Sequence, residues 1–176
     1  MKTRPFLVAV AAGILAVGIA IPASAAPGET AAKVTITGGF LSITVPADAG
    51  SLGSIVNTVG GGTISGSLGQ VVVTDARSAA AGSTWVASVI STALTPLSGP
   101  TIPASAVGYT VGTITKVGTA TYTANDPTNL TGVSPAVTAT GITGDNSATW
   151  NPTINVAVPG GTIAGTYSGT ITHSVV

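Results

Sequence analysis

Few side chains of this sequence belong to the types that perform catalysis. The chain holds one histidine, His173, and no cysteine. Acid–base and nucleophilic catalysis usually recruit His, Cys or paired carboxylates. Ser174 follows His173 directly, but successive residues of a strand point to opposite faces, so the two cannot form a nucleophile–base pair. We therefore predict no catalytic residue and a protein that is not an enzyme.

The acidic side chains do not form a pattern that binds metal. The five acids are spread along the chain, and no spacing resembles a calcium loop or a zinc site. Asp126 and Asn129 favour an Asx turn rather than a pair of ligands. We predict no metal ion and no cofactor.

Two tryptophans and a nearby acid–base pair are the candidate binding residues. Trp85 begins the stretch Trp85-Val86-Ala87-Ser88-Val89, and Trp150 begins the stretch Trp150-Asn151-Pro152-Thr153-Ile154. A tryptophan in a β protein is most often a core anchor, and an exposed one can stack on a sugar ring. Asp75 and Arg77 precede Trp85; they either contribute to binding or pair with each other within the sheet. His173 is a lesser candidate, and its alternative is a half-buried histidine on the core face with nitrogens bonded to backbone or water.

The elements that would position these residues are strands. The segment from Thr166 to Ser174 alternates hydroxyl side chains with Tyr167, Gly169, Ile171 and His173, which is typical of a strand with one face on a core. β-Branched residues and scattered glycines dominate after residue 26, which predicts one all-β domain, an antiparallel sandwich of Ig-like or barrel-like form. The expected strands are 33–37, 40–45, 70–75, 84–91, 108–114, 119–123, 136–140, 148–158 and 165–175, with a small-residue turn at 78–83 and a Gly/Ser-rich loop with short strands at 51–68.

Alternation also assigns the faces of the strands. The residues expected to point inward are Val34, Ile36, Leu41, Ile43, Val45, Trp85, Val89, Ile154, Val156 and Val158; those expected to point outward are Thr35, Thr37, Ser42, Thr44 and Asn155. Pro152 and Pro159 place the strand between them at a sheet edge or a bulge, because proline cannot donate to a ladder.

The N-terminus has the pattern of a secretory signal peptide. Lys2 and Arg4 precede an apolar run, Phe6–Ile21, and a small-residue cleavage site, Ala23–Ala25. The run is shorter than the roughly 20 residues that a transmembrane helix needs. We predict a signal peptide over 1–25, a mature β-domain over 26–176, and a secreted protein with no membrane span after cleavage.

The mature chain is weakly charged. From residue 26 on it carries three basic residues and five acids, which gives a net charge near −2. It has no basic patch that could neutralise phosphates, and this excludes nucleic acid as a charge-driven partner. A surface of hydroxyl groups suits contact with neutral polymers, although it is also the ordinary outer face of a threonine-rich sheet.

Two segments resemble a known family. The sequence Val73-Thr74-Asp75-Ala76-Arg77, a small-residue turn and then the strand that contains Trp85 resemble the bacterial WxL surface domain, and residues 165–175 resemble its closing strand. The resemblance spans roughly residues 32–176 and is to a diverged, actinobacterial-type member. Ala87 replaces the leucine of the first Trp-x-Leu motif, and His173 and Val175 replace the tryptophan and leucine of the second.

The resemblance implies a secreted protein that associates non-covalently with the Gram-positive cell wall. Its partner would be peptidoglycan, another wall polymer or another surface protein, and Trp85, Asp75, Arg77, Trp150 and His173 are the residues expected to take part. The alternative is a structural or assembly subunit, or an adaptor of a cell-surface complex, that binds no glycan. Strand edges rich in Thr and Val, with little charge to block pairing, favour this alternative.

Overall fold

The computed structural model describes residues 31–176, so the predicted signal peptide lies outside the described residues. Residues Ile36–Val176 form one compact unit, and it is all β. Every strand pair is antiparallel, which confirms the predicted fold class. The strands are β1 (Leu41–Thr44), β2 (Gly62–Ser67), β3 (Val71–Ser91), β4 (Thr95–Pro96), β5 (Val107–Thr110), β6 (Thr115–Ala124), β7 (Ser134–Trp150), β8 (Thr153–Val158), β9 (Tyr167–Ser168) and β10 (Ile171–Val175), with a 3-10 turn, η1, at Ala104–Ala106.

The largest sheet has five strands and is built around β3. Its order is β1-β3-β7-β6, and β10 also pairs with β3. The strands β1 and β10 use different parts of β3, because Leu41 lies opposite Asp75 and Ile171 lies opposite Ser91. The C-terminal strand is therefore part of the sheet, as its alternation predicts.

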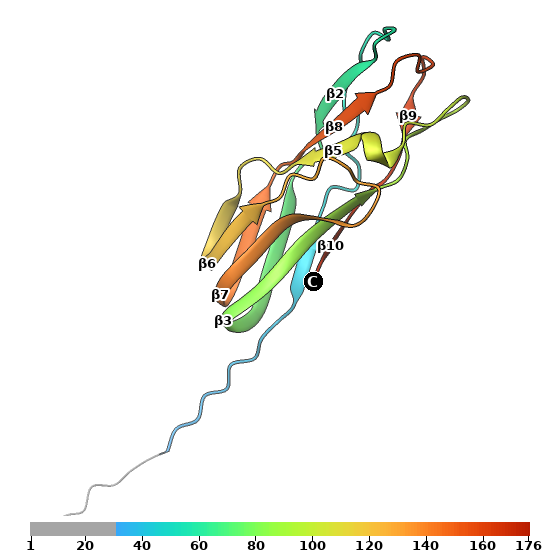
Figure 1. Ribbon diagram of the computed structural model, residues 1–176. Helices are drawn as coiled ribbons and strands as arrows, with labels where there is room; N and C mark the ends of the chain where they lie inside the picture. The colour runs from blue at the N-terminus through green and yellow to red at the C-terminus, as the bar shows by residue number, and fades with distance from the viewer. Residues whose placement is uncertain (1–30) are drawn as a thin grey trace, which may run out of the picture. The chain divides into compact units, whose positions relative to one another are not determined.

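The three long strands β3, β6 and β7 each turn back on themselves (Figure 1). The register of β3 with β7 shifts at several points between Asp75 and Trp85, and the register of β6 with β7 shifts around Gly118. Residues with positive φ lie at these bends: Ser78, Gly82, Gly118, Gly141 and Gly144. The four glycines adopt this conformation without the steric penalty that a Cβ brings.

The bends let one sheet supply both layers of a sandwich. Val73 lies before the bend of β3 and Val89 lies after it, yet both are fully buried in the same hydrophobic cluster. Strands that change layers through bulges are a known way to make the corner of a β-sandwich. Gly118 is required at the corner, since a Cβ there would lie 2.4 Å from the carbonyl oxygen of Asp145.

In the half of the domain away from the bends, the two layers differ in how much regular structure they contain. On one side lies a three-stranded sheet of order β2-β8-β5. On the other side the regular structure is a short ribbon, in which β4 pairs with β9 over two residues and Leu94 bridges Ile102. The second layer is thus incomplete in this half.

Several predicted strands differ from the observed ones. The segments 70–75 and 84–91 belong to one strand, because the small residues between them form a bulged bend rather than a turn. The predicted strand 33–37 has no regular secondary structure. The segment 148–158 divides at Pro152 into the end of β7 and the whole of β8, and 165–175 divides into β9 and β10. The loop 51–68 contains β2, as expected.

The strand β8 lies in the middle of its sheet, so the prediction of an edge strand is wrong. Pro152 precedes the ladder and Pro159 follows it, and neither removes a donor from it. Among the faces, Val34, Ile36 and Val45 are exposed and not inward. The other predicted inward residues are buried or partly buried in the core.

Candidate functional site

The predicted pair Asp75 and Arg77 forms an ion pair at the bend of β3. The Arg77 Nε atom donates to Asp75 Oδ1 at 2.8 Å, and Nη2 donates to Oδ2 at 2.9 Å. Asp75 has no exposed surface, whereas the Arg77 side chain is 37% exposed. The hydrogen bonds from Arg77 lower the pKa of Asp75, and the same contact raises the pKa of Arg77. This outcome agrees with the expectation that the two residues pair within the sheet.

Trp85 joins this pair to a buried polar network. Its side chain is 1% exposed, and Nε1 donates to Asn146 Oδ1 at 3.0 Å. The Tyr122 hydroxyl donates to the same oxygen, and its ring lies 5.6 Å from the Trp85 ring. Asn146 Nδ2 donates to Asp75 Oδ2 at 3.1 Å. We call Asp75, Arg77, Trp85, Tyr122 and Asn146 the bend network.

Trp150 and His173 meet at a second buried cluster, around Tyr109. Trp150 Nε1 donates to the Tyr109 hydroxyl at 2.8 Å, and that hydroxyl lies 3.1 Å from His173 Nε2. The Tyr109 and His173 rings meet edge to face at 5.5 Å. We call these three residues the tyrosine cluster.

The tyrosine cluster holds its histidine neutral. Because the Tyr109 oxygen accepts from Trp150, its own proton is available to His173 Nε2, and this assigns the histidine proton to Nδ1. That buried Nδ1 has no hydrogen-bond partner within residues 31–176. Burial lowers the pKa of His173 to about 4 and raises the pKa of Tyr109. The histidine is half-buried on the core face, which is the alternative to a binding role given above. Its Nε2 atom bonds the Tyr109 side chain, however, and not backbone.

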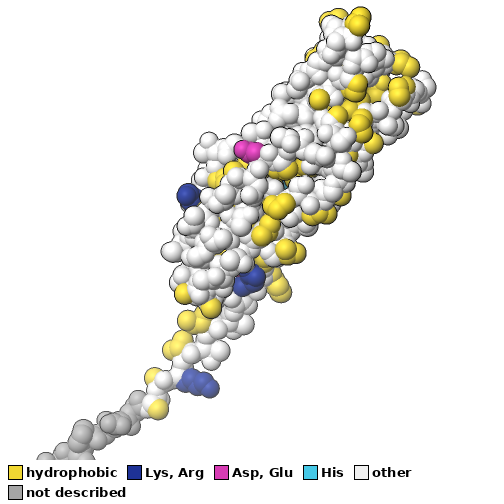
Figure 2. Space-filling model, viewed as in Figure 1, with side chains coloured by type: hydrophobic (Ala, Val, Ile, Leu, Met, Phe, Trp, Pro, Cys, Tyr) yellow, Lys and Arg dark blue, Asp and Glu magenta, His cyan; other side chains and the backbone are white. Residues whose placement is uncertain are grey.

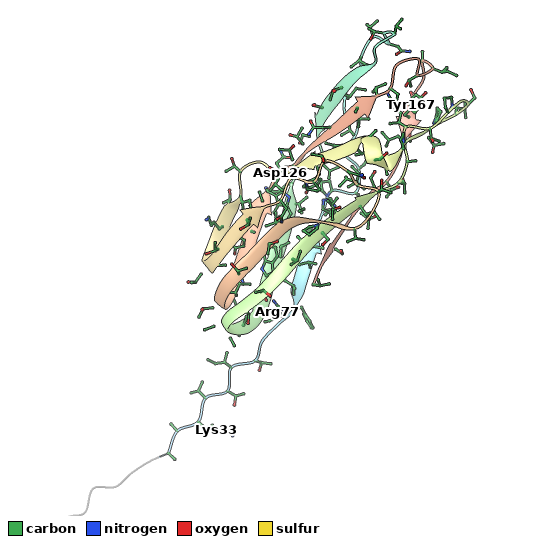
Figure 3. All side chains as sticks on the ribbon, viewed as in Figure 1. Lys33, Arg77, Asp126 and Tyr167 are labelled. Carbon is green, nitrogen blue, oxygen red and sulfur yellow. The ribbon has the colours of Figure 1, made fainter. Side chains whose placement is uncertain are left out.

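The five predicted binding residues therefore lie in two clusters that face the core. Neither indole has an exposed face on which a sugar ring could stack in this conformation, since Trp85 and Trp150 are 1% and 2% exposed. Arg77 is the one member with substantial exposure, and Figure 3 labels it beside the bend of β3. Asn129 forms the expected Asx turn with Thr131, whereas Asp126 accepts from the distant Val111 N–H at 2.7 Å.

A groove of about 810 Å³ opens where the second layer is incomplete. One wall is the segment from Pro46 to Ile55 and the other is the segment from Thr162 to Ile171. Its floor contains apolar side chains from sheet β2-β8-β5 and from the bridge region, among them Ile64, Val156, Val158, Leu94 and Ile102. No sequence pattern predicts this groove, because its walls are mostly irregular segments more than 100 residues apart in the chain.

The first wall of the groove offers unpaired backbone. Within the described residues, the backbone from Pro46 to Val56 makes no backbone–backbone hydrogen bond. Its polar contacts are local, with Gly50 N–H donating to Asp48 and Gly53 N–H donating to Ser51. On the opposite wall Tyr167, labelled in Figure 3, is half-buried and donates its hydroxyl to the Ile163 carbonyl at 2.9 Å.

Exposed aliphatic side chains gather beside the groove on three loops. We call Val56, Val59, Leu97 and Ile163 the apolar loop end; Val59 is 98% exposed and Leu97 is fully exposed. The loops are neighbours, since the Asn57 amide donates to the Thr162 carbonyl and a Cβ on Gly99 would touch Ile163. Figure 2 shows hydrophobic side chains gathered at this end and no charged side chain there on the visible face.

No group of three or more His, Cys, Asp or Glu side chains that could hold a metal ion lies within residues 31–176. The same range contains no helix long and apolar enough to cross a membrane. Comparisons with protein-family models, curated proteins and solved structures found no match.

Proposed function

We propose that the protein is a secreted, non-enzymatic surface protein that associates non-covalently with the Gram-positive cell wall through its WxL-like β-domain. The partner is peptidoglycan, another wall polymer or a protein bound to the wall. The resemblance in the Asp75–Trp85 region and in the C-terminal strand supports this assignment. The buried positions of Trp85 and Trp150 give them a structural role in it, so the contact surface must lie elsewhere.

The observation that carries the proposal is the uncharged apolar loop end. The aliphatic side chains of this end, Val56, Val59, Leu97 and Ile163, are exposed. They lie in three stretches of the sequence that contain no charged residue, 49–74, 78–115 and 146–172. Exposed apolar patches of this kind mark interaction sites. A contact made there does not depend on ion pairs, and salt should not screen it.

Sedimentation with washed Gram-positive cell walls tests the proposal. The exported protein is incubated with walls over a range of salt concentrations, and N-terminal sequencing of the same preparation checks the predicted start at Ala26. We expect co-sedimentation that persists at high salt. The double variant Val59→Ser/Leu97→Ser should lose most of it, whereas Val133→Ser, which changes another exposed valine, should retain it. No sedimentation of the wild-type protein would contradict wall association.

An assembly or adaptor role is the second candidate. It is favoured by a specific observation, namely that β6 ends the five-stranded sheet and that the predicted strand 33–37 pairs with nothing among the described residues. Unpaired edges and unpaired strands are templates for β-augmentation by another chain. Self-association in solution without affinity for walls would favour this role over the first.

A further inference from the structure

The segment Lys33–Thr37 has the sequence of a strand but pairs with no other strand among residues 31–176. Its residues alternate between apolar and threonine side chains after Lys33, and Val34 and Ile36 therefore lie on one face of an extended chain. Both are almost fully exposed, at 85% and 82%. Burial of this apolar face against a sheet would be favourable, because it removes apolar surface from water.

The segment cannot bury this face by continuing β1 straight on. Gly39 N–H donates to the Ala76 carbonyl, and Ala76 N–H donates to the Phe40 carbonyl, so the chain is held beside β3 at this point. In β1 the core-facing residues have odd numbers, Leu41 and Ile43, whereas the apolar residues of the segment have even numbers. A straight continuation would direct Val34 and Ile36 away from their own core.

The groove has the features that an added strand requires. Its floor is apolar, and its first wall, the segment from Pro46 to Ile55, makes no backbone–backbone hydrogen bond within the described residues. Only the Gly50 and Gly53 N–H groups of this wall are taken, by the side chains of Asp48 and Ser51. A five-residue strand is about 17 Å long and needs pockets for alternate side chains. The charges also match, because Lys33 is the one ionised side chain of the segment and Asp48 is the one in the groove lining.

We propose that the segment Lys33–Thr37 of one copy inserts as a strand into the groove of a second copy, with Val34 and Ile36 directed at its apolar floor. Each copy carries one segment and one groove, so the contact is heterologous and repeats from copy to copy. This inference deepens the assembly role and does not depend on wall association. It predicts oligomers that grow with protein concentration.

Cysteine cross-linking tests the contact directly, because the chain contains no cysteine of its own. A Val34→Cys variant is mixed with a size-tagged Ser54→Cys variant and oxidised. We expect a disulfide-linked species of mixed size. A tagged Val133→Cys variant, whose cysteine lies outside the groove, should give much less of it. Equal yields from the two partners would overturn the proposal.

The segment's apolar face can be tested with a matched pair of variants. Ile36→Asp places a charge on the inserting face and should weaken association by more than about tenfold. Thr37→Asp places the same charge on the opposite face and should retain association. Both residues are exposed, so neither change should affect folding, which circular dichroism checks. Sedimentation velocity over a concentration series gives the oligomeric state.

The results separate this proposal from other occupants of the groove. A wild-type protein that stays monomeric would overturn it, and a disulfide within one chain of a Val34→Cys/Ser54→Cys double variant would then show that the segment folds back on its own copy. Oligomers that Ile36→Asp leaves intact would assign assembly to another surface. A monomer that still sediments with walls would retain the proposed wall association while removing this inference.

Discussion

The bend network and the tyrosine cluster each bury one tryptophan and satisfy its indole N–H, but they differ in the rest of their polar atoms. In the bend network Asp75 receives donors from Arg77 and Asn146, and Asn146 Oδ1 receives two more. In the tyrosine cluster His173 Nδ1 is buried and finds no partner in the part of the chain that the structure describes. A network with its charges paired stabilises the fold over a wide range of pH, whereas a buried histidine that must stay neutral makes stability depend on pH.

Removal of the Asp75 carboxylate should have the largest effect. Asp75→Ala removes the carboxylate acceptor of Arg77 and Asn146, and we expect a loss of about 3 kcal/mol in the free energy of unfolding. The loss should not be larger, because Arg77 keeps its bond to the Thr84 carbonyl and can reach water. Urea denaturation at neutral pH measures it. Asp48→Ala, at an exposed carboxylate that accepts one backbone N–H, is the control and should cost well under half as much. Equal losses would remove the special role of the bend network.

Acid should affect the tyrosine cluster before it affects the bend network. Burial lowers the pKa of His173 from 6.5 to about 4, so as the pH falls the unfolded chain takes up a proton first. The stability that His173 contributes is complete above about pH 6.5 and is lost down to about pH 4, by at most about 3 kcal/mol.

The contribution of Asp75 has a different window. Its pKa is lowered from 3.8, so its stability is present above that value and is lost only at lower pH. Urea midpoints measured at pH 7 and at pH 4.5 separate the two clusters. His173→Gln should flatten the profile between these values, and an unchanged slope in that variant would assign the dependence to another group.

The two indole N–H groups should contribute unequally. Trp85→Phe leaves Asn146 Oδ1 with the Tyr122 hydroxyl as a donor, whereas Trp150→Phe removes the one donor to the Tyr109 oxygen. We expect Trp150→Phe to cost about 1 kcal/mol more than Trp85→Phe, measured by thermal or urea unfolding. The opposite order would mean that ring packing, and not hydrogen bonding, decides the difference.

Exchange of Arg77 for lysine should have the smallest effect. Arg77→Lys keeps the positive charge but loses the two-pronged contact with Asp75, and the partly exposed site lets water replace the missing bond. We expect a loss below about 1 kcal/mol, together with a rise in the pKa of Asp75 that NMR titration can detect. A loss as large as that of Asp75→Ala would show that geometry outweighs charge in the bend network.

The fold class follows from the sequence because alternation and β-branched composition are local signals. The bends do not, since the small residues at 78–83 look the same in a hairpin turn and in a bulged strand. Likewise the segment 33–37 has strand propensity, but propensity does not say whether a partner is present. Local signals therefore define the strands better than their pairing.

The candidate site shows the same limit. The sequence draws attention to Trp85 and Trp150, but their hydrogen-bond partners lie 61 and 41 residues away along the chain. No rule of sequence spacing relates residues so far apart. The sequence therefore leaves open whether each tryptophan is a buried core residue or an exposed stacking surface. The groove depends on the meeting of residues near 50 with residues near 165, which is a property of the topology alone.

The long pairing of β3 with β7 has a consequence for how the protein folds. Val89 pairs with Ser134 and Val71 pairs with Trp150, so the central ladder joins residues 45 to 79 positions apart. Proteins dominated by such distant pairings fold in milliseconds to seconds, because the loop must close before its contacts form. Until then most of β3 lacks its longest neighbour, and during this interval the chain is most open to aggregation.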